Sequence, residues 1–194
     1  SSNGANGSNG YNARGAGSGA GGGIWVTTEI LEGSGRLEAL GGSKGGSNNY
    51  GGGGGAGGRI AVYYGDWTNF SFPGDTHVSG GSGRYVAGDF GTLVFANHKG
   101  TEDRSDDTLW VKQGWRWEAG DGPFNFGDFS AENNTTITGP DDANAPFSFN
   151  TMTLKSGVVW SPNVHGTTLT ANTISLLDES KILSGSQSLD LHIN

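Results

Sequence analysis

The sequence contains no cysteine, and this absence excludes several kinds of site at once. None of its 194 residues can form a disulfide, a thiolate metal site or a cysteine nucleophile. Proline is scarce, at five residues, and lysine and arginine total only 11 against 19 acidic residues. The net charge of −8 repels a phosphate backbone, so we expect no nucleic-acid partner.

Long hydrophobic runs are also missing from the chain. No apolar stretch approaches the roughly 20 residues needed to span a bilayer, and no charged start leads into an apolar signal segment. We therefore expect no membrane insertion. The chain begins at Ser1 without Met and inside a glycine- and asparagine-rich tract, so we interpret it as a mature product or an excised piece.

Glycine and aromatic residues are abundant in contrast. The 38 glycines follow no collagen triplet, and such a content usually indicates disorder. However, six Trp, nine Phe and five Tyr supply large apolar surfaces that disordered chains lack. The composition therefore predicts a folded β protein that is rich in loops.

Four stretches in the second half repeat one pattern: an apolar pair, a bend and a second, mostly apolar pair. Positions two apart on a strand share a face, so each stretch predicts two short inward-facing strands. Successive stretches follow one another at intervals of about 20–23 residues, close to one solenoid coil. The four sets are Leu109, Val111, Trp115, Trp117; Phe129, Ala131, Thr135, Ile137; Met152, Leu154, Val158, Trp160; and Ile174, Leu176, Ser180, Ile182.

Repeats of this length are typical of solenoids, in which each coil buries its core only against its neighbours. We predict an all-β fold, a right-handed parallel β-helix (β-solenoid) in which Leu109, Phe129, Met152 and Ile174 form one buried column. An antiparallel sandwich with evenly spaced strands is the alternative.

The first half contains a repeat of its own, because residues 15–28 realign with residues 51–64 at a shift of 36. In both copies a glycine run leads into an alternating strand. A phosphate-binding loop would need a following helix, which the pattern does not predict. Two interpretations of the glycine runs remain open: flexible surface loops, or extended glycine backbone that packs closely against neighbouring chain segments. We favour the packed backbone.

The periodic pattern weakens after the glycine-rich half, and we place a boundary near residue 75. This gives a glycine-rich portion at residues 1–75 and, at 76–194, coils of about 20–23 residues each. At the end of the chain, Leu189, Leu191 and Ile193 alternate like the start of another coil. Such an open edge favours self-association.

The segments GGGIWVTT and GGGGGAGGRIAVYY resemble the glycine-rich repeats of large secreted bacterial surface proteins. FNTMTLKSGVVWSPNVHG and LTANTISLLDESKIL resemble rungs of adhesin-type right-handed parallel β-helices. The resemblance implies an extracellular or cell-surface location and a structural or adhesive role, with self-assembly into a fibre or a surface layer. It supplies no fixed catalytic residues.

Residues suited to catalysis are not arranged in any known motif. None of the four histidines lies in a nucleophile elbow, and no two are close enough in sequence for a zinc site. We therefore predict a non-catalytic protein. The enzyme alternative is a Ca²⁺-dependent polysaccharide-cleaving β-helix, in which Lys112 would serve as base and Arg104 would offset substrate charge.

An acidic loop is the candidate metal site. Asp103, Asp106 and Asp107 could hold Ca²⁺ through carboxylate oxygens, although the order of an EF-hand loop is absent and Arg104 interrupts the cluster. A solvated charged loop is the alternative interpretation. No other cofactor is predicted.

Three aromatic residues are candidates for binding surface carbohydrate. Trp110 lies between the inward positions Leu109 and Val111 and should point outward, where its ring could stack on a sugar. Tyr63 and Trp25 could do the same. An ice-binding face would need regular outward threonines, but Thr151, Thr153, Thr170 and Thr173 do not repeat through the neighbouring coils.

Three asparagines lie in N-x-S/T sequences, which are acceptors for N-glycosylation. They are Asn69, Asn133 and Asn134. These sites matter only if the source organism glycosylates its secreted proteins.

Overall fold

The computed structural model describes most of the chain, namely residues 1–9, 15–46, 51–70, 77–99, 104–116, 124–132, 135–138, 146–161, 167–183 and 189–193. These residues form an almost entirely β structure whose sheets are mostly parallel. The predicted all-β class is therefore correct. The predicted boundary at residue 75 lies outside the described residues.

The strands of the described residues form two sheets. The eight-stranded sheet has, in spatial order, β1 (Gly23–Gly33), β2 (Arg59–Phe70), β3 (Thr92–Asn97), β4 (Thr108–Gln113), β6 (Phe124–Ala131), β8 (Phe147–Leu154), β10 (Thr167–Leu176) and β12 (Leu189–Ile193). The four-stranded sheet has the order β11 (Lys181–Ile182), β9 (Val159–Trp160), β7 (Thr136–Thr138) and β5 (Trp115–Arg116). A short 3-10 helix, η2 (Arg104–Asp106), precedes β4.

The chain divides into two compact units. Unit 1 comprises residues 1–27, 32–62 and 68–93, and unit 2 comprises residues 28–31, 63–67 and 94–194. Unit 1 holds the glycine-rich segments, while unit 2 holds β4 to β12 and a continuous cluster of buried hydrophobic side chains.

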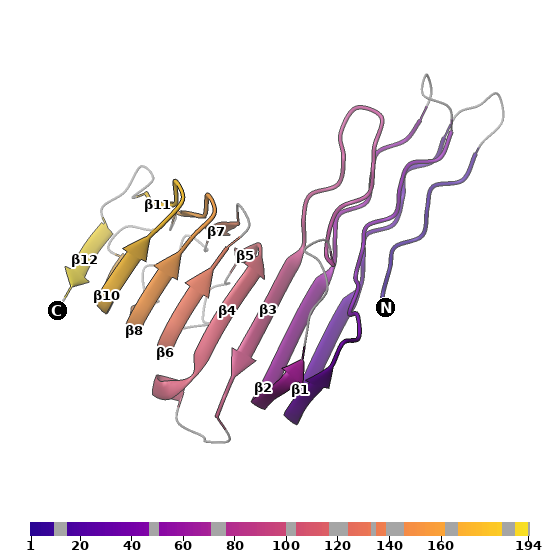
Figure 1. Cartoon of the computed structure of the whole chain (residues 1–194). Helices are drawn as coiled ribbons and strands as arrows, with labels where there is room; N and C mark the ends of the chain where they lie inside the picture. The colour runs from indigo at the N-terminus through magenta and orange to yellow at the C-terminus, as the bar shows by residue number, and fades with distance from the viewer. Residues whose placement is uncertain are drawn as a thin grey trace. The chain divides into compact units, whose positions relative to one another are not determined.

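The strand register confirms that the four residues of the predicted column are neighbours; Leu109, Phe129 and Met152 are buried, whereas Ile174 is only partly buried. Leu109 pairs with Phe129, Phe129 with Met152, and Met152 with Ile174, always between parallel strands. Figure 1 shows β6, β8 and β10 side by side and pointing the same way. This pairing is parallel, unlike that of the antiparallel sandwich that the repeat left open.

The predicted pairing between β5 and β7 was wrong. The offset of the repeat placed Trp117 opposite Ile137, but the partner of Ile137 is Trp115. The cause is the tight turn after β4, where Gly114 alone, with a φ of 35°, separates β4 from β5. Trp117 itself lies outside the described residues.

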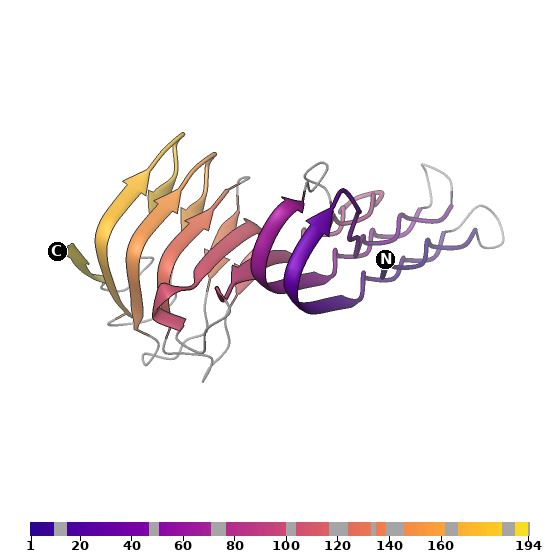
Figure 2. The same ribbon diagram turned by 60° about the horizontal axis from the view of Figure 1, so that its bottom comes forward.

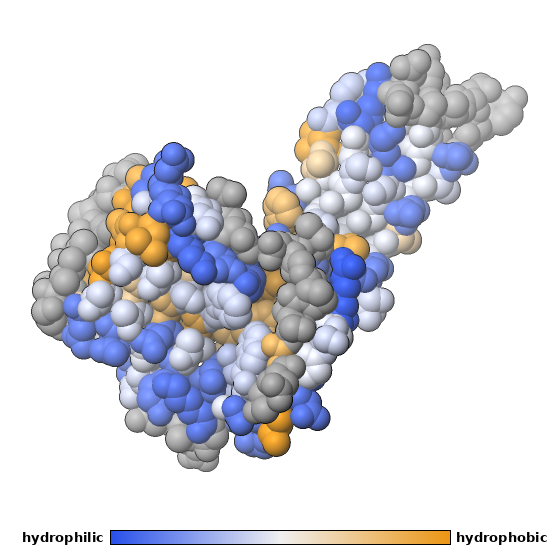
Figure 3. All heavy atoms as spheres, in the orientation of Figure 1, coloured by the Kyte–Doolittle hydropathy of each residue, from blue (hydrophilic) through white to orange (hydrophobic). Residues whose placement is uncertain are grey.

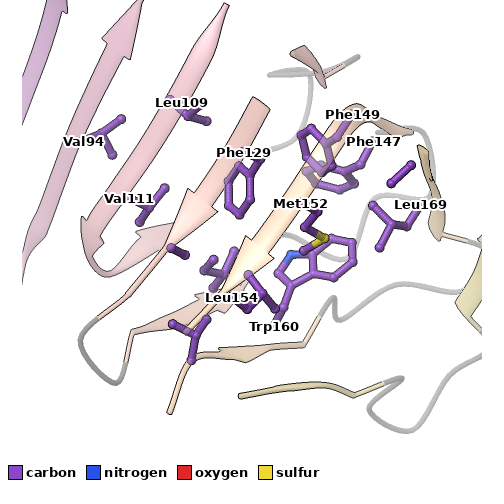
Figure 4. Packing of buried hydrophobic residues seen from close by; sticks show 14 of the residues in the cluster. Val94, Leu109, Val111, Phe129, Phe147, Phe149, Met152, Leu154, Trp160 and Leu169 are labelled. Carbon is purple, nitrogen blue, oxygen red and sulfur yellow. The ribbon is translucent and has the colours of Figure 1, made fainter. Parts of the chain in front are cut away.

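Aromatic side chains fill the core of unit 2, between the two sheets (Figure 4). Trp160 and Phe147 are almost fully buried and meet edge to face, with ring centroids 5.2 Å apart. Phe129 and Phe149 stack at 5.0 Å. Inward residues alternate with outward ones along β4, β6 and β8, and this alternation forms one continuous apolar cluster.

Backbone hydrogen bonds with a three-residue period hold unit 1 together. The N–H groups of Gly58, Gly55 and Gly52 donate to the carbonyls of Ala39, Gly42 and Gly45 respectively. A three-residue period without regular strand pairing is characteristic of extended polyproline II-type segments. Unit 1 therefore contains neighbouring extended segments, which Figure 2 shows running alongside one another.

The glycines are needed because these segments lie very close together. A Cβ at Gly41 would lie 2.0 Å from the carbonyl oxygen of Gly55, and a Cβ at Gly15 would lie 1.8 Å from that of Gly45. No side chain fits at such a distance. The prediction of closely packed glycine backbone is therefore confirmed, and these tracts are not plain surface loops.

The repeat of the first half is also confirmed, and it has a third copy that the sequence did not reveal. The N–H of Arg59 donates to the carbonyl of Gly22, so the two predicted copies lie side by side. The N–H of Thr92 donates in the same way to Gly58. The third copy contains β3 and few glycines, which explains why it was missed.

Candidate functional surface

A polar surface covers the outward side of β4, β6, β8 and β10. We call it the hydroxyl face, because two columns of mostly hydroxyl side chains cross the strands there, about 4.8 Å apart from strand to strand. One column is Thr108, Asp128, Thr151 and Thr173, and the other is Trp110, Ser130, Thr153 and Ser175. Asp128 and Trp110 interrupt the hydroxyls, so the face is not a continuous threonine array.

An ion triad lies beside these columns, where the strands end. Lys112, Glu132 and Lys155 lie on successive strands or just after them, and both lysine ammonium groups contact the Glu132 carboxylate. The Nζ of Lys155 lies 2.8 Å from Oε2 of Glu132. The carboxylate therefore joins three neighbouring strands by charge-assisted hydrogen bonds.

The protonation of Glu132 is set by two opposing effects. Burial, which leaves the residue only 7% exposed, raises its pKa because water no longer stabilises the charge. Hydrogen bonds and attraction from Lys112 and Lys155 oppose burial and bring the pKa below its ordinary value. Glu132 is therefore ionised at neutral pH.

Trp110 points outward as predicted, but its ring is partly covered. The Lys112 ammonium lies 3.6 Å from the ring centroid, in a cation–π contact. The rings of Trp67 and Phe95 lie 5.9 and 6.1 Å away. A sugar would have to displace Lys112 or bind to the remaining part of the ring.

The other two predicted sugar-binding residues lie in different surroundings. Tyr63 is partly buried and packs against the core of unit 2. Trp25 is 71% exposed on β1, and its Nε1 donates to Oγ1 of Thr27 at 3.1 Å. Trp25 therefore has the most accessible ring of the three predicted residues.

The predicted calcium residues are only partly described. Asp103 lies outside the described residues, Asp106 ends η2, and Asp107 is fully buried immediately before β4. Full burial of Asp107 contradicts the interpretation of a solvated charged loop at that position. In the part of the chain that the structure describes, no three His, Asp or Glu residues gather to hold a metal ion. The calcium site stays a prediction.

The remaining sequence candidates add no assembled site. Asn133 and Asn134 lie outside the described residues, and Asn69 lies within β2. Of the two residues considered for catalysis, Lys112 belongs to the ion triad and Arg104 begins η2. Their roles as glycosylation or catalytic residues stay predictions.

No family model, curated protein or solved structure matches this chain. The resemblance to bacterial surface repeats therefore stays a prediction. Within the described ranges, no helix has the length and hydropathy that crossing a membrane requires.

Sequence reasoning missed the ion triad, although its signal was present. Lys112, Glu132 and Lys155 follow one another at the same offsets as the first steps of the apolar repeat. Extending the repeat to charged positions would have placed the three residues in one column.

Proposed function

We propose that unit 2 is a right-handed parallel β-helix and that the chain is a non-catalytic extracellular structural or adhesive segment. The observation that supports this is the nearly constant register: steps of one coil length relate neighbouring strands in both sheets. Each such step adds one strand to each sheet and one layer to the core. Adding such coils lengthens the molecule while the fold of each coil stays the same.

Unit 1 supports an adhesive role because it exposes aromatic side chains on closely packed backbone. Tyr85 is 79% exposed and Phe90 is 63% exposed, in addition to Trp25. Exposed aromatic rings of this size can supply a large contact area to another molecule. Backbone that is fixed by hydrogen bonds loses little entropy when it binds.

Electron microscopy combined with sedimentation tests this proposal on the chain of 194 residues. A structural segment is expected to resist proteases and to form regular assemblies at neutral pH. A protease-sensitive monomer that cleaves an acidic polysaccharide in the presence of Ca²⁺ would instead establish the enzyme alternative.

Polysaccharide binding on the hydroxyl face is a second candidate function. The two columns present repeated hydroxyls that can exchange hydrogen bonds with the hydroxyls of a sugar chain. On a glycan array, Thr153→Leu is expected to lose binding that Trp25→Ala retains. If Trp25→Ala loses binding and Thr153→Leu retains it, the carbohydrate binds on β1. If both variants retain binding, neither site is used.

A further inference from the structure

Three asparagines of unit 1 recur at every third residue, and each is followed by glycine. They are Asn3, Asn6 and Asn9, and no other asparagine of the chain precedes a glycine. Their side-chain oxygens accept hydrogen bonds from backbone N–H groups of the neighbouring extended segment. The N–H of Leu40 donates to Oδ1 of Asn3 at 2.9 Å, and that of Ser43 donates to Oδ1 of Asn6 at 2.8 Å. The three-residue period of this backbone therefore directs all three side chains at the same neighbour.

The glycine of each step is bound by the same residue as the asparagine. The N–H of Gly4 donates to the carbonyl of Leu40 at 2.8 Å, and the N–H of Gly7 donates to that of Ser43 at 2.9 Å. Each Asn-Gly step therefore bonds both polar backbone groups of one residue, its N–H through the asparagine side chain and its carbonyl through the glycine. Gly10, which follows the third asparagine, lies outside the described residues.

Close packing explains why glycine stands at these positions. A Cβ at Gly4 would lie 2.1 Å from the carbonyl oxygen of Gly19, and a Cβ at Gly7 would lie 2.3 Å from that of Ala16. No residue with a side chain fits at such a distance. Packing therefore requires the glycine, while hydrogen bonding to the neighbouring segment favours the asparagine before it.

The resulting Asn-Gly dipeptide is chemically labile, because glycine has no side chain to hinder its nitrogen from attacking the asparagine side chain. A bond forms between this nitrogen and Cγ. The bond from Cγ to the side-chain nitrogen breaks, and that nitrogen leaves as ammonia with the proton of the glycine N–H. Water then opens the cyclic imide to aspartate or isoaspartate. Asparagine and water are thus converted to an acidic residue and ammonia, without any other reactant.

Water reaches these steps, so exclusion of solvent does not protect them. Asn3, Asn6 and Asn9 are all exposed, and Figure 3 shows hydrophilic residues along the glycine-rich segments of unit 1. What opposes the reaction is the position of its atoms. To close the ring, Gly4 must give up the proton that binds the Leu40 carbonyl, and the side chain of Asn3 must turn away from the Leu40 N–H.

We propose that Asn3-Gly4 and Asn6-Gly7 are deamidation sites that the folded protein protects, and that they react only when residues 1–9 separate from the neighbouring segment. The isoaspartate product has one more carbon atom in the backbone, which breaks the three-residue period and prevents the segment from binding as before. The modification then converts a transient opening into a permanent change. This inference concerns unit 1 alone and is independent of the proposed function.

Deamidation of the folded and the unfolded chain tests this proposal. The chain of 194 residues is incubated at mildly alkaline pH with and without urea, and fragmentation mass spectrometry follows each asparagine separately. Because the reaction proceeds from the open state, we expect both steps to react about tenfold or more slowly in the folded chain. A peptide with the sequence of residues 1–9 is the control for any effect of urea on the chemistry itself. Equal rates in the folded and the unfolded chain would overturn the proposal.

Leu40→Pro tests one of the protecting bonds. Proline has no N–H to donate to Asn3, yet its fixed φ fits extended backbone of this kind. In the folded variant we expect Asn3 to deamidate several-fold faster than in wild type. Asn6, which Ser43 binds, should keep its wild-type rate and is the control within the same molecule. An unchanged or slower reaction at Asn3 would contradict protection by this bond. If circular dichroism shows that the variant does not fold, the comparison of folded and unfolded wild type decides.

Discussion

At the scale of single residues, Glu132 is the clearest case of a side chain that joins several strands. Its carboxylate is nearly buried, and it contacts two lysines that lie on or just after the neighbouring strands. A buried ion of this kind is tolerated because its partners lie within hydrogen-bond distance. Removing the charge leaves two ammonium groups close together without their common partner.

Glu132→Gln is therefore expected to lower the free energy of unfolding at neutral pH by about 1–3 kcal/mol. The pKa of Glu132 is lowered in the folded state, so its stabilising effect is present above the ordinary value and is lost as the pH falls through the lowered pKa. Urea unfolding at neutral and at acid pH should show wild type and variant converging in acid. Glu179→Gln, in an exposed turn, is the control that should change little.

At the scale of the elements, the two units are stabilised in different ways. Strands of unit 2 bury alternating apolar side chains, whereas segments of unit 1 bury glycine backbone. Backbone packing is intolerant of added atoms, since a carbonyl group cannot move aside as a flexible side chain can. The cost of a substitution in unit 1 therefore depends on whether the glycine faces another segment or open space.

Gly41 and Gly53 form a matched pair for testing this dependence. A Cβ at Gly41 would lie 2.0 Å from the carbonyl oxygen of Gly55, while a Cβ at Gly53 would meet nothing within 4 Å. We expect Gly41→Ala to destabilise by about 1–3 kcal/mol or more through overpacking. Gly53→Ala should be neutral or stabilise by about 0.4–1 kcal/mol, because alanine restricts the unfolded chain.

Denaturant unfolding of the two variants measures this difference. Equal destabilisation by both would show that glycine is required for backbone flexibility and not for close packing.

At the scale of the whole molecule, the β-helix that we propose for unit 2 should tolerate the loss of one complete repeat. Leu154 pairs with Leu176, so deleting residues 155–176 joins two paired positions of neighbouring strands and keeps the later register. Deleting only residues 155–165 removes half a coil and sets the following strand out of register. The stack predicts opposite outcomes for these deletions.

We expect the full-coil deletion to unfold cooperatively at a somewhat lower temperature, and the half-coil deletion to lose its tertiary structure. Circular dichroism during heating checks both outcomes. Equal unfolding temperatures for the two deletion variants would contradict the proposed stack of equivalent coils.

The sequence by itself determined the column of paired residues in unit 2. When parallel strands recur at a fixed interval along the chain, residues separated by that interval lie side by side in the sheet. Leu109, Phe129 and Met152 could be aligned from their spacing alone. The spacing could not place Trp115 opposite Ile137, because that depended on a one-glycine turn after β4.

Tertiary structure alone decided the rest. Glycine content showed that backbone could approach backbone, but glycine has no side chain to specify which segments meet, so the three-residue hydrogen-bond pattern required the fold. The same holds for the partial covering of Trp110, which comes from Trp67 on β2 and Phe95 on β3. Local pattern fixes which way a side chain points along a strand, whereas long-range packing fixes what it meets there.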